Sequence, residues 1–416
     1  MSEQRNIVLV TVDSLRADRC GHLGGNGSTP TLDRLADEGL SFTNAIAPGP
    51  STLDAMPVIF TGEEVHARDT EASVKAIHEQ FAHHMHSRDT LTERLDRRGY
   101  ETGAFTANPW TSRFFGFDVG FDHFEDFMAE DRSAGLIERS LEERGAADDS
   151  ALLYAIQLVL NWSQETNMFQ SWGSFYDDAI DWARDAEEPY FLWLFLVDVH
   201  MPYLPEAGHR RRSLLSTYAA NLWLYLGAGR GESFFRTPLL DAYDDTVQYV
   251  DTLLGQLVED LADDDPLVVV HADHGEEFGE HGVYGHGPNV YEEQVHSPLV
   301  VAGGPTGTID EPFSLADLPE LLVRLADGDD VTDLGEPVVR ARNRDPKVAA
   351  RGRDWKYIAT EDGEELYDLT ADEFTEIGTP ELRELGRQLV EHWNEDETER
   401  RRIATAAREV TEETML

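Results

Sequence analysis

Residues 268–282 read VVVHADHGEEFGEHG, and the other parts of the chain can be placed around them. The stretch begins as an apolar, β-branched run, which is typical of a strand buried on both faces of a sheet. The run ends near Asp273 and His274, beside Gly275. Because open α/β sheets hold their ligand sites at the carboxyl ends of the strands, we expect these two side chains at a functional site. A carboxylate beside an imidazole suits Mn, Fe or Zn better than Ca.

On its own, an Asp-His-Gly motif is more often a polar loop after a core strand, so the prediction depends on a second strand. Residues 6–12, NIVLVTV, form another continuous apolar run, and Asp13 follows it directly. If the two strands are neighbours, Asp13 and Asp273 converge on one metal ion. The alternative for Asp13 alone is a helix N-cap or a turn residue, which is common for aspartate.

A third feature is a hydroxyl pair at the predicted start of a helix. Residues 48–62, PGPSTLDAMPVIFTG, pass from a Pro/Gly-rich loop into an apolar helical stretch that ends at a glycine. Ser51 and Thr52 stand near the beginning of that helix. Their hydroxyls have two uses that the sequence leaves open: capping the helix, or acting as a nucleophile beside a helix N-terminus that favours an anion.

The composition limits the class of protein. The chain has 416 residues, enough for one large α/β domain or two domains, with 81 acidic residues, 34 basic residues and a formal charge of -47. The acids are spread along the whole chain, a pattern that we interpret as the surface of a halophilic protein working in a high-salt cytosol. With no basic patch, nucleic-acid binding is not expected. The single cysteine, Cys20, excludes an internal disulfide.

The sequence also predicts a cytoplasmic location. The first residues, MSEQRNIVLV, lack a basic region, a long apolar region and a small-residue cleavage site. The most apolar later windows, such as 191–199, are too short to span a bilayer, so no transmembrane segment is expected.

Four motifs occur in one order along the chain and together carry a resemblance. They are VDSLRAD at 12–18, TPTLDRLADEGLSFTNAIAPGPSTLDAMPVIFTG at 29–62, FLWLFLVDVHMPY at 191–203 and VVVHADHGEEFGEHGVYGHG at 268–287. This order resembles the sulfatase-like branch of the alkaline phosphatase superfamily, which includes sulfatases and phosphonate and phosphodiester hydrolases. The resemblance implies an α/β fold: an α/β/α sandwich with a mostly parallel central sheet and a small C-terminal α+β subdomain.

We expect the domain boundary near residue 337. Residues 1–336 would form the catalytic domain, with a helical insertion at about 130–190 where apolar residues recur at helical spacing. Residues 337–416 would form the subdomain, with a small antiparallel sheet and an amphipathic helix from Pro380.

The resemblance assigns the metal ligands and the nucleophile. In that family a divalent metal is held by an aspartate after the first strand, by the nucleophile, and by an Asp-Asn or Asp-His pair after a late strand. These positions match Asp13, Thr52, Asp273 and His274. Ser14 stands where many sulfatases have a second aspartate, which favours Mn, Zn or Fe and leaves Mg or Ca possible.

Thr52 also decides which chemistry is expected. Family members that use formylglycine make it from Cys or Ser in a C/S-x-P-x-R motif, whereas here Thr52, Asp54 and Met56 take the places of the Cys or Ser, the proline and the arginine. No formylglycine is therefore expected. Threonine is the nucleophile in phosphodiesterase and phosphotransferase relatives, and a bound metal would lower the pKa of its hydroxyl.

Further positions that match the family would bind the substrate: Asn108, Asp198, His200 and His286, with His200 and His286 also catalytic. Asp198, His200 and His286 could alternatively build a second metal site. Ala107 and Pro109 replace a Lys and a His that contact the sulfate in relatives, which disfavours a sulfate monoester.

We therefore predict a metal-dependent hydrolase of sulfate or phosphate esters, with phospho- or phosphonoesters favoured. The substrate would be a small-molecule or glycan- or lipid-derived anionic ester. Two alternatives remain: a transferase of the same fold that passes the phosphoryl substituent to another acceptor, and a non-catalytic protein that binds anions or a partner. A homo-oligomer is possible.

Overall fold

The computed structural model describes residues 4–65, 74–127, 170–227, 231–343, 347–370, 375–376 and 378–414. Most of the predicted insertion at 130–190 lies outside these ranges; its last part contains helix α7 (Tyr176–Asp185). Across the described ranges, every helix is too short or too polar to cross a membrane.

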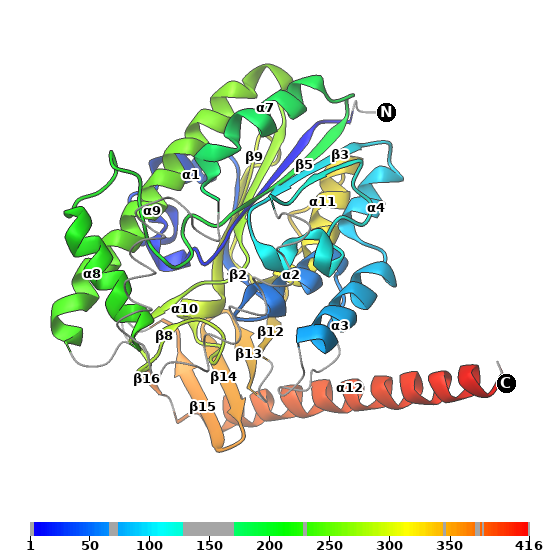
Figure 1. Ribbon diagram of the computed structural model, residues 1–416. Helices are drawn as coiled ribbons and strands as arrows, with labels where there is room; N and C mark the ends of the chain where they lie inside the picture. The colour runs from blue at the N-terminus through cyan, green and yellow to red at the C-terminus, as the bar shows by residue number, and fades with distance from the viewer. Residues whose placement is uncertain are drawn as a thin grey trace.

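A large mixed sheet forms the centre of the molecule (Figure 1). Its strand order is β10-β2-β9-β6-β1-β5-β3-β4, and β11 pairs with β2. The pairs from β6 to β4 are parallel, and β9 runs antiparallel to both β6 and β2. The bounds are β1 (Ile7–Val12), β2 (Leu40–Ile46), β3 (Glu101–Thr106), β4 (His123–Glu125), β5 (Tyr190–Leu196), β6 (Leu267–Ala272), β9 (His296–Ala302), β10 (Gly307–Ile309) and β11 (Phe313–Ser314).

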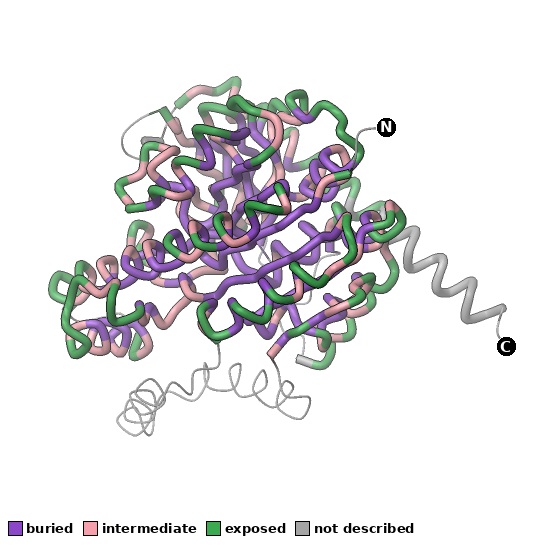
Figure 2. The backbone as a smooth tube through the Cα atoms, turned by 90° about the horizontal axis from the view of Figure 1, so that it is seen from above, coloured by how far each residue is buried: buried purple, intermediate pink, exposed green. Residues whose placement is uncertain are grey.

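Helices cover both faces of this sheet, as expected for an α/β/α sandwich (Figure 1). One layer contains α1 (Pro30–Glu38), α7 and α9 (Glu232–Asp260), and the other contains α2 (Thr52–Thr61), α3 (Val74–His86), α4 (Leu91–Asp96) and α11 (Leu318–Asp327). Every residue of β1, β5 and β6 is buried between the layers. Figure 2 shows buried segments running through the middle of the molecule, with exposed segments around them. That burial explains why the central strands read as continuous apolar runs.

The C-terminal part forms a second, antiparallel sheet, as predicted. It contains β12 (Val338–Arg342), β13 (Val348–Gly352), β14 (Trp355–Thr360), β15 (Gly363–Asp368) and β16 (Thr375–Glu376). Helix α12 (Pro380–Thr414) packs Leu382, Leu389, Val390 and Trp393 against this sheet. The first part of the amphipathic helix that the sequence predicts from Pro380 therefore packs against this second sheet.

The register of the central strands positions the site. In the parallel pair of β1 and β6, Val12 lies opposite Ala272, so the next residues, Asp13 and Asp273, leave the sheet side by side. In the pair of β1 and β5, Val12 lies opposite Leu196. The polar residues after three adjacent strands therefore meet at one edge of the sheet, where open α/β sheets bind their ligands.

Candidate active site

Two buried carboxylates form the floor of the site. Asp13 and Asp273 are both fully buried. Ser14 has a left-handed backbone, with φ of 61°, and its N–H donates to Asp273 Oδ1 at 3.3 Å. Its hydroxyl donates to Asp13 Oδ1 at 2.9 Å. A serine in this conformation costs about 1–2 kcal/mol, and here the strained residue serves both carboxylates of the floor.

His274 completes the floor and has a fixed tautomer. Its Nδ1 lies 2.8 Å from the carbonyl oxygen of Gly275, which can only accept a hydrogen bond, so Nδ1 carries the proton. The Nε2 lone pair therefore faces the two carboxylates, with Asp13 Oδ1 and Asp273 Oδ2 each 3.5 Å away. A backbone carbonyl that orients a histidine in this way is common at metal sites.

These three residues fit a divalent metal ion. Their ligand atoms all lie within 4.8 Å of one another, and Asp273 Oδ2 is buried without a hydrogen-bond partner. Burial raises the pKa of Asp273 to about 7, and burial together with Asp273 raises the pKa of Asp13. Burial lowers the pKa of His274 to about 4. Because a cation would stabilise both carboxylates and use the neutral imidazole, the donor set suits a metal that accepts oxygen and nitrogen.

Thr52 lies beside this cluster as the first residue of α2. Its Oγ1 is 3.4 Å from His274 Nε2, and its hydroxyl is close enough to Asp273 to lower the raised pKa of that carboxyl in part. Neither hydroxyl caps the helix in the usual way: Ser51 occupies the N-cap without a side-chain cap and donates to Asp54 Oδ2 instead. The Thr52 hydroxyl thus points into the cluster at a helix N-terminus, where an anion is favoured.

Asn108 joins the floor to Thr52. It follows β3 and is buried, and its Nδ2 donates to Asp13 Oδ2 at 2.7 Å and lies 3.4 Å from Thr52 Oγ1. Its Oδ1 accepts from the Trp110 N–H at 2.8 Å, which fixes the amide orientation. Asp13, Asp273, His274 and Asn108 therefore lie around Thr52, and Asn108 contacts both Asp13 and Thr52.

The two predicted catalytic histidines form a half-buried rim. The ring of His286 lies between those of His274 and His200, with centroids 4.6 and 5.2 Å away. His200 Nδ1 donates to the Met201 carbonyl, and His286 Nδ1 donates to Glu276 Oε1 at 3.0 Å. Both rings are close enough to Asp13 to lower its raised pKa in part.

Asp198 bonds residues outside the floor and the rim. Leu196 is level with Val12 in the sheet, so Asp198 lies one position further along its strand end than Asp13 does. Its carboxylate accepts from the Ser171 hydroxyl at 2.7 Å and from the Trp172 N–H at 3.0 Å. Burial raises its pKa to about 6. These contacts anchor the segment that leads to His200.

Apolar side chains occupy the positions where the family pattern has cations. Met56 and Ala107 are buried, as is Pro109. The nearby guanidinium of Arg16 is already bound to Asp18, Glu280 and the Glu276 carbonyl. The charged groups that most affect the pKa of Asp13 are the Asp273 carboxylate, which raises it, and three imidazoles, which lower it.

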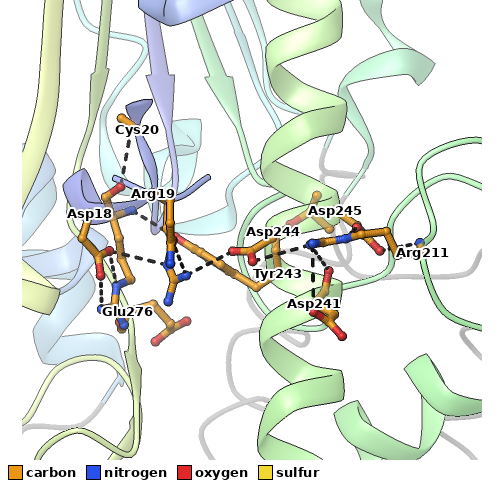
Figure 3. Close-up of polar contacts among 12 residues, drawn as sticks. Asp18, Arg19, Cys20, Arg211, Asp241, Tyr243, Asp244, Asp245 and Glu276 are labelled. Carbon is orange, nitrogen blue, oxygen red and sulfur yellow. Dashed lines mark hydrogen bonds and ion pairs between the residues drawn. The ribbon is translucent and has the colours of Figure 1, made fainter. Parts of the chain in front are cut away.

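Three buried side chains that the motif reasoning missed hold the site together. Glu276 accepts from His286 and, through Oε2, from the Tyr203 hydroxyl at 2.9 Å. Tyr243 of α9 donates to the Ser14 carbonyl and accepts from the Arg16 N–H, so it fixes the loop after β1. Figure 3 shows Tyr243 reaching from α9 to the segment around Arg19. Asn221 of α8 (Leu214–Tyr225) binds both backbone groups of Tyr203. Of these three residues, only Glu276 had a signal in the sequence, because it follows the Asp-His-Gly motif directly.

Comparison with known proteins finds a relative that matches part of this chain. A choline-sulfatase of Rhizobium meliloti (strain 1021) is 31% identical over 162 residues, which cover 32% of this chain and 31% of that protein. The alignment thus spans about a third of that relative.

Solved structures share the fold. A phosphonate monoester hydrolase of Agrobacterium radiobacter is 18% identical, with a TM-score of 0.58 over 88% of this chain and 90% of the other. A structure solved in complex with its substrate D-glucosamine-2-N,6-O-disulfate is 17% identical, with a TM-score of 0.66 over 95% of this chain and 99% of the other. The sequence model of the sulfatase family matches residues 5–328. The chain therefore belongs to the sulfatase family, and its fold is that of the alkaline phosphatase superfamily.

Proposed function

We propose that this protein is a metal-dependent hydrolase of singly charged phosphorus esters, phosphodiesters or phosphonate monoesters, with Thr52 as the nucleophile. The observation that carries the proposal is the position of Thr52 Oγ1 at a helix N-terminus, in contact with His274, Asp273 and Asn108. Enzymes of this family generally use a divalent metal, and Asp13, Asp273 and His274, with Thr52, would hold it here. When bound, the metal would supply positive charge and lower the pKa of the Thr52 hydroxyl.

The reaction would have two steps. Thr52 Oγ1 attacks phosphorus as its proton passes to His200 or His286, the bond to the leaving oxygen breaks, and the imidazole gives that proton to the leaving oxygen. Water then attacks the phosphoryl- or phosphonyl-threonine ester and gives a proton to the same imidazole, and the bond between Oγ1 and phosphorus breaks as Oγ1 takes up that proton and the hydroxyl is restored. Asn108 donates from the floor and holds Thr52 in place, since its Nδ2 contacts both Asp13 and the threonine.

The buried apolar side chains support the choice of ester. A phosphate monoester would bring a second negative charge, which needs fixed cations around the anionic oxygens. Met56, Ala107 and Pro109 offer none. A diester or phosphonate replaces one anionic oxygen by a neutral substituent, which suits an apolar wall. The same replacements make a sulfate monoester the weaker candidate.

The test is turnover of an aryl phosphodiester, an aryl phosphonate and an aryl sulfate at molar salt, with the metal content of the purified protein measured in parallel. We expect faster turnover of the phosphorus esters and a loss of about 10³-fold or more in Thr52→Ala. Ser51→Ala is the matched control, because it removes the neighbouring hydroxyl, which bonds Asp54. Intact mass after a short reaction should show an adduct that Thr52→Ala lacks.

Three results would overturn the proposal: equal turnover in wild type and Thr52→Ala, a clear preference for the sulfate, or a metal-free protein that binds the esters without cleaving them. Product that carries the phosphoryl group on an added alcohol, at the expense of hydrolysis, would instead identify a transferase.

A further inference from the structure

The hairpin formed by α8 and the start of α9 differs in composition from the remainder of the chain. The whole sequence has 81 acidic residues in 416, about one in five, yet positions 207–231 contain none. Three consecutive arginines, Arg210, Arg211 and Arg212, precede α8. In a chain with a charge of -47, this segment is where an apolar or anionic surface would meet the least repulsion.

The hairpin also exposes large apolar side chains. Among the residues whose burial the structure describes, five large hydrophobic side chains are exposed, and four lie here: Leu214 (45%), Leu215 (80%), Leu226 (51%) and Phe234 (72%). Leu215, Leu222 and Leu226 follow helical spacing, so they share the outer side of α8. Thr217, Ala220, Asn221 and Leu224 are buried on its inner side. A helix that is apolar all round is normally buried on all sides, whereas the exposed leucines at both ends of α8 are left open by the residues that the structure describes.

Acids of α9 that face the hairpin are paired with its arginines, whereas Glu232, the first residue of α9, accepts from the Tyr284 hydroxyl. Arg211 forms ion pairs with Asp244 and Asp245 of α9, and Arg212 pairs with Asp241. Figure 3 shows Arg211 reaching across to these aspartates. The outer surface of the hairpin therefore combines apolar side chains with locally balanced charge.

The inner face of the hairpin holds the rim of the candidate site. Asn221 binds the backbone of Tyr203, whose hydroxyl donates to Glu276 beside His286. The ring of Trp223 packs on Tyr284 at 5.0 Å, and Arg236 donates to the carbonyl of Phe278. Figure 1 shows α8 standing at the side of the molecule beside β8 (Tyr284–Gly285) and α10 (Glu292–Val295). Whatever covers the outer face is thus held close to the residues that support the rim.

We propose that the α8–α9 hairpin docks on a lipid–water interface and brings the site to an ester held in that surface. A lipid surface accepts protruding apolar side chains without a complementary shape, as interfacial helices show. A second copy of the chain would need an apolar surface of complementary shape, whereas a lipid surface does not, and the acid-free positions 207–231 suit anionic head groups. The proposal that the hairpin docks on lipid depends only on the hairpin. The proposal that the substrate is held in the lipid also rests on the proposed function.

The test is flotation of the full chain with vesicles of phosphatidylglycerol and phosphatidylcholine in equal parts, at molar salt. We expect the protein to float with the vesicles, and Leu215→Glu/Phe234→Glu to reduce the bound fraction about tenfold or more. Leu385→Glu is the matched control, because Leu385 is the fifth exposed side chain and lies on α12, outside the hairpin. Thermal unfolding should match wild type in both variants, since all three side chains are exposed.

A second measurement separates docking from catalysis. Turnover of a soluble aryl phosphodiester should be the same in wild type and the double variant, whereas turnover of a phosphodiester carried in the vesicles should fall in the variant. No flotation of the wild type, or equal flotation of the double variant, would overturn the docking. A dimer in solution that Leu215→Glu/Phe234→Glu dissociates, without flotation, would identify a second copy as the occupant. Flotation without turnover of either ester would overturn the proposed function and leave the docking intact.

Discussion

The floor and the rim of the candidate site are positioned by different kinds of structure. Asp13 and Asp273 stand at matched positions of two hydrogen-bonded parallel strands, and both are fully buried. His200 and His286 stand on loops, half-buried, and their Nδ1 atoms bond the Met201 carbonyl and the Glu276 carboxylate. Backbone register cannot be changed by one side chain, whereas a loop histidine can turn when its partner is lost. Changes in the floor should therefore abolish metal binding, and changes in the rim should alter rates.

The largest effect should follow from Asp273→Asn. The side chain keeps its shape but loses the charge that a divalent cation needs, and Asp273 Oδ2 has no other partner in the described structure. We expect bound metal to fall below stoichiometric amounts and kcat/KM to drop about 10³-fold or more. Metal analysis and soluble-ester turnover measure this. A variant that keeps both metal and activity would show that the floor is not the metal site.

Much of the floor could be predicted from the sequence, because strands buried on both faces read as apolar runs and their ends are easily found. The order of the motifs in the sequence placed Asp13, Thr52, Asp273 and His274 together. The sequence could not reveal that Val12 lies opposite Ala272, since strand pairing depends on contacts between distant segments. It could not reveal Glu276 or Tyr243 either, because a buried acid and a buried tyrosine look like any others until their partners are known.

Within the rim, His286→Ala should have a larger effect than His200→Ala. His286 lies between the other two imidazoles and is bonded to a fully buried carboxylate, so its position is more strictly fixed. We expect kcat to fall about 10²-fold for His286→Ala and about tenfold for His200→Ala, with metal content unchanged. Loss of metal in either variant would show that this histidine is a ligand of a second metal ion.

A loss no larger than that of His286→Ala should follow from Glu276→Gln, which keeps the bond to Tyr203 but removes the charge behind His286. Glu276 does not touch the substrate in this arrangement, so it acts as a positioning residue. We expect kcat to fall about 10–100-fold while KM changes little. Glu277→Gln is the control: this neighbouring buried carboxylate is held by Asn289 instead. Equal losses in the two variants would mean that any buried charge here is merely structural.

The smallest effect is expected for Asp198→Asn. The sequence pattern suggested that Asp198 contacts the substrate, but its carboxylate is bonded to Ser171 and to the Trp172 N–H. An asparagine can still accept from both through its oxygen, so kcat/KM should stay within about threefold of wild type and stability should fall by about 1 kcal/mol. Kinetics and thermal unfolding measure the two quantities. A drop in kcat/KM as large as that of His286→Ala, at unchanged stability, would show that Asp198 contacts the substrate together with the two rim histidines.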